Sequence, residues 1–164
     1  MRKPARTWGK WALYGLLFLI TVVTQTVFLA HTQFFGTKLS FVPLVIVCVA
    51  VREGMEPGGL FALLTSLFWF FSGSADGSLC IFTLTLSGLL AGYFCGAYLT
   101  KNLVPCLLFC LIALILTQGG SFGIQSYLGG NFPADGWLLV GKQVILSLIV
   151  TPVFWGLTRL IGKL

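Results

Sequence analysis

Residues 77–101, GSLCIFTLTLSGLLAGYFCGAYLTK, form the stretch that decides the fold. The stretch is apolar enough and long enough to cross a bilayer as one helix. Within it Gly88, Gly92 and Gly96 recur at every fourth position, and residues four apart lie on one face of a helix. A groove of small residues lets a second backbone approach closely, which is a main way in which helices dock in lipid. We therefore predict a central helix over 77–100 that packs through these three glycines.

The composition of the chain excludes a soluble fold. Hydrophobic residues make up 57% of the 164 residues and charged residues only 9%, with a mean hydropathy of +0.99. A soluble domain carries about 25% charged residues, which it needs to cover its core. The net charge of +6 is spread singly between apolar runs, so it indicates membrane topology and not nucleic-acid binding. We predict a single-domain, all-α integral membrane protein.

Polar breaks divide the chain into six apolar segments. We predict transmembrane helices at about residues 11–30, 34–51, 57–71, 77–100, 103–117 and 137–161. The first apolar run is longer than the core of a signal peptide, which indicates a retained span. The second and third segments are short for a membrane span. The glycine-rich segment 118–136 predicts a long connection in place of a continuous helix.

The distribution of basic residues gives the predicted orientation. With both termini in the cytoplasm, the outer side would carry only Lys38 and Lys142. The cytoplasmic side would carry eight basic residues, namely Arg2, Lys3, Arg6, Lys10, Arg52, Lys101, Arg159 and Lys163. Because cytoplasmic loops of membrane proteins are enriched in Lys and Arg, this asymmetry favours six spans with both termini inside.

A few polar residues are candidates for contacts. Gln25 lies in an apolar span and predicts either a hydrogen bond between helices or a polar group lining a site. Lys142 lies near the outer end of the last span, where it either extends toward the interface or contacts a partner or ligand. Arg52, Glu53 and Glu56 form either a solvated turn or a cytoplasmic docking point.

The sequence contains no recognisable catalytic set. The lone His31 has no carboxylate or cysteine nearby in sequence to complete a metal site. The odd count of cysteines argues against a disulfide framework; they are Cys48, Cys80, Cys95, Cys106 and Cys110. Cys106 and Cys110 share a helix face, but no His or carboxylate lies near them in sequence, so we interpret them as packing residues. We expect no enzymatic activity, no cofactor and no bound metal.

The layout of the chain resembles the rod shape-determining protein MreD family. The resemblance rests on Gln25 late in the first span, on VCVAVREG at 47–54, on GGLFALLTSLFWFFSGSADGSL at 58–79 and on SGLLAGYFCG at 87–96. It covers most of the chain through apolar and glycine-rich motifs. Trp69 stands where the family commonly has an aspartate.

The resemblance implies a non-enzymatic scaffold subunit of the bacterial cell-elongation and peptidoglycan-synthesis machinery. Its expected location is the cytoplasmic membrane, and its expected partners are membrane lipid, an MreC-like protein and other wall-elongation proteins, with self-association left open. The family's fold is similar to that of the substrate-binding S components of energy-coupling factor vitamin transporters. An S component with a vitamin-binding cavity is therefore the alternative function.

Overall fold

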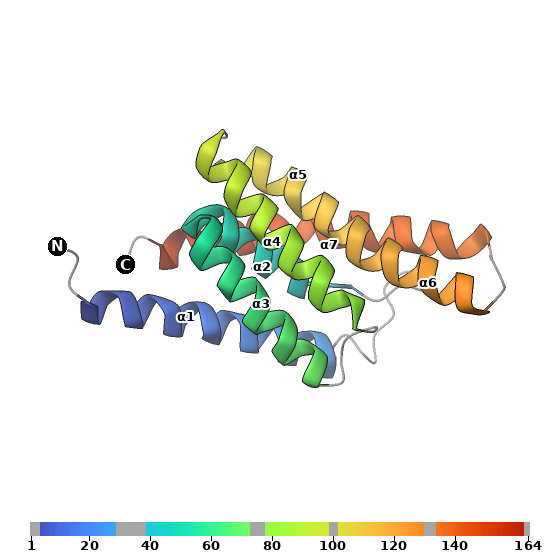
Figure 1. Ribbon diagram of the computed structural model, residues 1–164, viewed down its shortest axis with the longest axis horizontal. Coiled ribbons are helices and arrows are strands. Elements are labelled where there is room, and N and C mark those ends of the chain that lie inside the picture. The colour runs from blue at the N-terminus through green and yellow to red at the C-terminus, as the bar shows by residue number, and fades with distance from the viewer. Residues whose placement is uncertain (1–3, 29–38, 73–77, 99–101, 130–133, 163–164) are drawn as a thin grey trace.

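The structure, a computed structural model, is built from helices. It describes residues 4–28, 39–72, 78–98, 102–129 and 134–162, and no strand occurs within these ranges. Figure 1 shows the elements: helices α1 (Pro4–Val23), α2 (Val42–Glu53), α3 (Met55–Phe71), α4 (Leu79–Ala97), α5 (Leu103–Leu114), α6 (Gly120–Gly129) and α7 (Ala134–Ile161), and the π-helical segments η1 (Thr24–Phe28) and η2 (Ile115–Gly119). The prediction of an all-α protein is confirmed.

Four helices in the described part of the chain are long and apolar enough to cross a membrane. They cover Trp8–Val27, Leu79–Ala97, Leu103–Gly129 and Gly136–Ile161, and α3 is a shorter apolar helix. Large apolar side chains cover their outward faces; Ile20, Phe82 and Ile145 are each more than half exposed. Apolar surface of this kind is costly in water and favourable against lipid tails. The prediction that the chain contains apolar helices long enough to cross a membrane is confirmed.

The centre of the bundle is α2, and the prediction that the helix over 77–100 is central is wrong. All ten residues from Val42 to Val51 are buried, and α2 contacts α1, α3, α4, α5 and α7. A helix that is hydrophobic on every side is favoured in a core. By contrast, α4 buries one face and exposes the other, where Phe82 is 65% exposed. Figure 1 shows α1 on one flank and α5 and α6 on the other, with α3 and α4 between them and α7 running behind them.

The helix in the second predicted span is shorter than expected. We predicted a helix over 34–51, but residues 39–41 are not helical and α2 begins at Val42; residues 34–38 lie outside the described ranges. Pro43 lies in the first helical turn, where its missing N–H costs least. At 1.5 Å per residue α2 is about 18 Å long, so it falls short of the roughly 30 Å hydrocarbon core of a bilayer.

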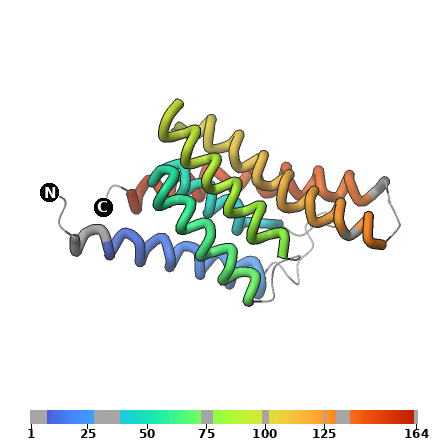
Figure 2. Tube along the Cα trace, in the orientation of Figure 1, coloured from blue at the N-terminus to red at the C-terminus, as the bar shows by residue number. Residues whose placement is uncertain are grey.

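The prediction of a non-helical connection over 118–136 is wrong for residues 118–129, which are helical. The helix of α5 continues through η2 into α6 and ends at Gly129; residues 130–133 lie outside the described ranges. Figure 2 shows this as one continuous rod lying beside α7. In lipid a backbone must satisfy its own polar groups, which favours a helix even in a glycine-rich sequence. The ring of Phe122 meets the ring of Trp137 edge-on at 5.2 Å, which packs α6 against α7.

Small residues allow α2, α3 and α4 to approach closely. Gly54 joins α2 to α3 with φ +100° and ψ −175°, a backbone conformation that is essentially restricted to glycine. One turn into α3, a Cβ on Gly58 would lie 2.6 Å from the Cα of Ala50, so only glycine fits there. The central helix α2 is therefore tightly packed with α3 and α4.

Candidate functional site

The three predicted packing glycines of α4 lie in two different environments. A Cβ on Gly88 would lie 2.6 Å from the Cβ of Ala62 on α3, and a Cβ on Gly92 would lie 2.8 Å from the backbone of Gly54. Both glycines are buried against the α2–α3 hairpin. Gly96 is exposed, and a Cβ there would have nothing within 4 Å. Gly88 and Gly92 therefore serve internal packing, and Gly96 lies on the outer surface.

Gln25 forms a cap on the beginning of α2. Its side-chain Oε1 accepts hydrogen bonds from the backbone N–H groups of Phe41 at 2.9 Å and Val42 at 3.2 Å. Ser147 of α7 accepts a third hydrogen bond from the N–H of Ser40, at 3.2 Å. The first N–H groups of a helix lack partners within the helix, and in a buried setting they need side-chain acceptors. Side chains from η1 and α7 therefore accept the hydrogen bonds of the backbone N–H groups at the start of α2.

A polar cluster holds the other end of α2. Lys10 Nζ of α1 lies 2.7 Å from Oε1 and 2.8 Å from Oε2 of Glu53, and Tyr14 Oη donates a hydrogen bond to Oε1 at 2.8 Å. The two charged side chains are only 19% and 14% exposed. A charge removed from water is costly unless it is paired and hydrogen-bonded, and both conditions are met here. This cluster joins α1 to the α2–α3 turn.

The remaining predicted polar residues lie around this arrangement. Arg52 is partly buried, and its side chain lies against Gly162 at the end of α7. Glu56 is exposed in the first turn of α3, and Lys142 is exposed on α7. Of the three residues predicted as a docking point, Glu53 is engaged inside the protein and Glu56 faces outward.

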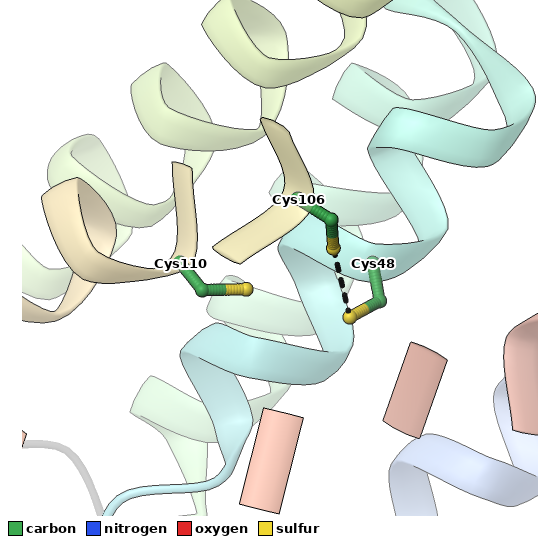
Figure 3. A group of neighbouring side chains, drawn as sticks. All are labelled: Cys48, Cys106 and Cys110. Carbon is green, nitrogen blue, oxygen red and sulfur yellow. Dashed lines mark hydrogen bonds between the residues drawn. The ribbon is translucent and has the colours of Figure 1, made fainter. Parts of the chain in front are cut away.

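Three cysteines meet in the middle of the bundle. Cys48 of α2 and Cys106 and Cys110 of α5 are fully buried, and their Sγ atoms all lie within 4.8 Å of one another. The Cys48 and Cys106 Sγ atoms are 3.4 Å apart. Figure 3 shows the Cys106 and Cys110 side chains pointing from α5 toward Cys48. The structure assigns none of the five cysteines, all of which lie in described helices, to a disulfide bond.

Several functional contacts could not be found from the sequence. The pair Cys106 and Cys110 was visible from its spacing, but Cys48 lies 58 positions before Cys106 and joins it only through the packing of α2 on α5. The partners of Glu53 were missed for the same reason, because Lys10 was assigned to topology alone. The one available signal was that Gln25 and Glu53 are polar residues next to strongly apolar runs.

One further residue singled out from the sequence, Trp69, lies in the core. Trp69, which stands where the resembling family commonly has an aspartate, is 3% exposed and packs in the core. Roles that depend on an acidic group at this position do not transfer to this chain. His31, Lys38 and Lys101 lie outside the described residues.

Comparison of the chain with models of known protein families, with curated proteins and with solved structures finds no match. The class that the structure itself defines is an α-helical protein with four described helices able to cross a membrane.

Proposed function

We propose that this chain is a non-enzymatic scaffold subunit of a bacterial cytoplasmic membrane. It crosses the membrane through six segments with both termini in the cytoplasm, and it contacts lipid and other membrane proteins through its outward helix faces. Neither a cofactor nor nucleic acid takes part in this function.

The observation that carries the proposal is the burial of α2 at the centre of the bundle. An S component of a vitamin transporter needs a cavity among its helices, and ligand sites are concave with a few convergent polar groups. In this chain the centre is occupied by α2, whose residues from Val42 to Val51 are all buried. The polar side chains of Gln25 and Glu53, at its two ends, are engaged in internal hydrogen bonds. This arrangement favours a rigid scaffold over a binder of small molecules.

The placement of the two terminal helices supports the proposed topology. Lys10 near the start of α1 pairs with Glu53, and Gly162 beyond the end of α7 lies beside Arg52. The first half of α1 and the end of α7 therefore both approach the turn between α2 and α3. An even number of crossings puts the two termini on one side of a membrane, and the excess of basic residues near them favours the cytoplasmic side.

The particular machinery is proposed from the sequence resemblance to the MreD family. In this proposal the chain acts with an MreC-like protein and other wall-elongation proteins in peptidoglycan synthesis and cell shape. The exposed surface of α4 around Gly96 and the exposed Glu56 of α3 supply docking positions that internal packing does not use.

The test is a quantitative pull-down of the tagged chain from native membranes in a mild detergent. We expect wall-elongation proteins to co-purify with the wild-type chain. A matched pair of variants reports on the surface: Gly96→Leu adds bulk on the exposed face, whereas Gly92→Leu adds it inside the protein. Gly96→Leu should reduce partner recovery at unchanged abundance, and Gly92→Leu should reduce abundance itself.

Two results would contradict the proposal. One is recovery of an ATPase module without any wall-elongation protein, which would indicate a transporter subunit. The other is stabilisation of the purified chain by a vitamin in a thermal-shift screen, because a ligand at 100 times its Kd adds about 2.7 kcal/mol of stability.

A further inference from the structure

The three-cysteine cluster has the form of a ligand set and lies apart from the polar contacts at the two ends of α2. Cys106 and Cys110 are four residues apart on α5, so their side chains project from one face of that helix. Cys48 meets them from α2, and the three Sγ atoms lie within 4.8 Å of one another. Three sulfur atoms from two helices thus surround one point in the core (Figure 3).

The chemistry of these atoms selects the kind of ion that fits. The group contains sulfur donors alone; no histidine or carboxylate of the described residues belongs to it. Soft thiolate ligands favour soft metals such as copper(I), whereas structural zinc sites almost always use four ligands in a tetrahedron. Copper(I) is satisfied by two or three sulfur ligands. We propose that Cys48, Cys106 and Cys110 bind one copper(I) ion between α2 and α5.

Burial of the cluster indicates a structural role for the ion. The three cysteine side chains have no exposed surface. Metal sites without an open position hold protein segments together, while catalytic sites keep a position free. The ion is taken up as α2 packs onto α5, and it ties the central helix to the outer rod formed by α5, η2 and α6. Because it binds the folded form, it raises the stability of that form.

The binding step is balanced by release of protons. Copper(I) forms bonds to two thiolates and one thiol, two S–H protons leave to solvent, and copper keeps its oxidation state. The loaded site then carries one net negative charge. Arg52, the one basic residue of α2, lies one helical turn after Cys48. Its charged group lies at the end of a side chain that rests against Gly162, so it offsets the charge of the loaded site only at a distance.

The experiment uses the full chain purified in detergent under anaerobic conditions. The probe is tetrakis(acetonitrile)copper(I), with bicinchoninate as the competing chelator. We expect one copper per chain after gel filtration, a sulfur-only coordination shell in X-ray absorption, and a higher unfolding temperature than for the metal-free chain.

Cys48→Ala, Cys106→Ala and Cys110→Ala should each weaken copper binding at least about tenfold. A loss of that size is already typical when a residue outside the direct ligands is removed. Cys95→Ala is the matched control, because Cys95 is a buried cysteine of α4 outside the cluster.

Several results would overturn the inference. The folded wild-type chain could take up no copper, or could hold it through nitrogen or oxygen ligands. Cys95→Ala could lose as much copper as the cluster variants. A disulfide between Cys48 and Cys106 in freshly isolated protein would also exclude the site. If a cysteine variant fails to fold, the X-ray absorption of the copper-loaded wild-type chain still shows whether sulfur atoms bind the ion.

Discussion

Gln25 of η1 and Phe41, which precedes α2, are joined by a hydrogen bond of 2.9 Å from the Phe41 backbone N–H to the Gln25 side-chain oxygen. This hydrogen bond ties the start of α2, the central helix, to the end of the long helix formed by α1 and η1. The same oxygen accepts from Val42, so a single amide satisfies two backbone donors at the start of α2. The π-helical turn at Thr24–Phe28 carries this side chain, and π-helical turns frequently occur at functional positions.

Gln25→Ala should lower the free energy of unfolding by about 1–2 kcal/mol. The physical reason is that two buried N–H groups lose their acceptor, which is comparable to the loss of a helix N-cap. Reversible unfolding in mixed micelles, followed by tryptophan fluorescence, measures the change. Thr24→Val is the control, because the Thr24 hydroxyl donates to the Ile20 carbonyl one turn earlier and its loss should change stability by less than about 0.5 kcal/mol. Equal losses in both variants would show that the cap contributes nothing specific.

Gly92→Leu should lower the stability of the protein, whereas Gly96→Leu should leave it nearly unchanged, although both residues lie on α4. A leucine at 92 would overlap the backbone of Gly54, where even a Cβ would be 2.8 Å away, and overpacking of this kind costs about 1–3 kcal/mol or more. Position 96 has open space around it, so the change there should stay within about 0.5 kcal/mol. Unfolding in mixed micelles and the abundance of folded protein in membranes measure both. A stable Gly92→Leu variant would contradict the close approach of α4 to the α2–α3 turn.

The contacts of Glu53 should couple energetically. Lys10→Met leaves a partly buried carboxylate without its counter-charge and should cost about 1–3 kcal/mol. Adding Glu53→Gln should recover part of that loss, giving an interaction energy of about 0.5–3 kcal/mol in a double-mutant cycle. Glu56→Gln is the matched control, because Glu56 is exposed and should change stability by less than about 0.5 kcal/mol. Strictly additive effects of Lys10→Met and Glu53→Gln would argue against the pair.

Residues 120–129 should exchange their amide hydrogens as slowly as an ordinary helix. Their backbone forms α6, and Phe122 packs edge-on against Trp137. Phe122→Leu should speed this exchange and cost about 0.5–1.5 kcal/mol beyond the loss of buried area, because an aromatic pair is removed. Tyr127→Leu is the control, since Tyr127 is 78% exposed. Hydrogen–deuterium exchange with mass spectrometry measures both, and fast exchange of the wild-type segment would restore the prediction of a loop over 118–136.

Local signals in the sequence were enough for some features and not for others. The apolar runs that became α4 and α7 were found within a few residues, because a membrane span needs about 20 apolar residues in a row. The first helix was predicted from residue 11, but α1 already begins at Pro4. The fifth segment was predicted to end at 117, but the rod of α5, η2 and α6 continues to Gly129. Glycine weakens helices in water, whereas a lipid environment favours a helix even in a glycine-rich sequence. The beginning of α2 was placed too far upstream, because the cap that starts it comes from Gln25, about sixteen residues earlier in the chain.

The sequence by itself determined that this chain is helical, that its surface is too apolar for water, and that Gly88, Gly92 and Gly96 form a row of small residues on one helix face. These properties follow from composition and periodicity, which are local. The tertiary structure alone decided that α2 is the centre of the bundle, that Glu53 meets Lys10 and Tyr14, and that Cys48 joins Cys106 and Cys110. Such contacts depend on which helix faces meet, and residues far apart in sequence come together only when the helices pack.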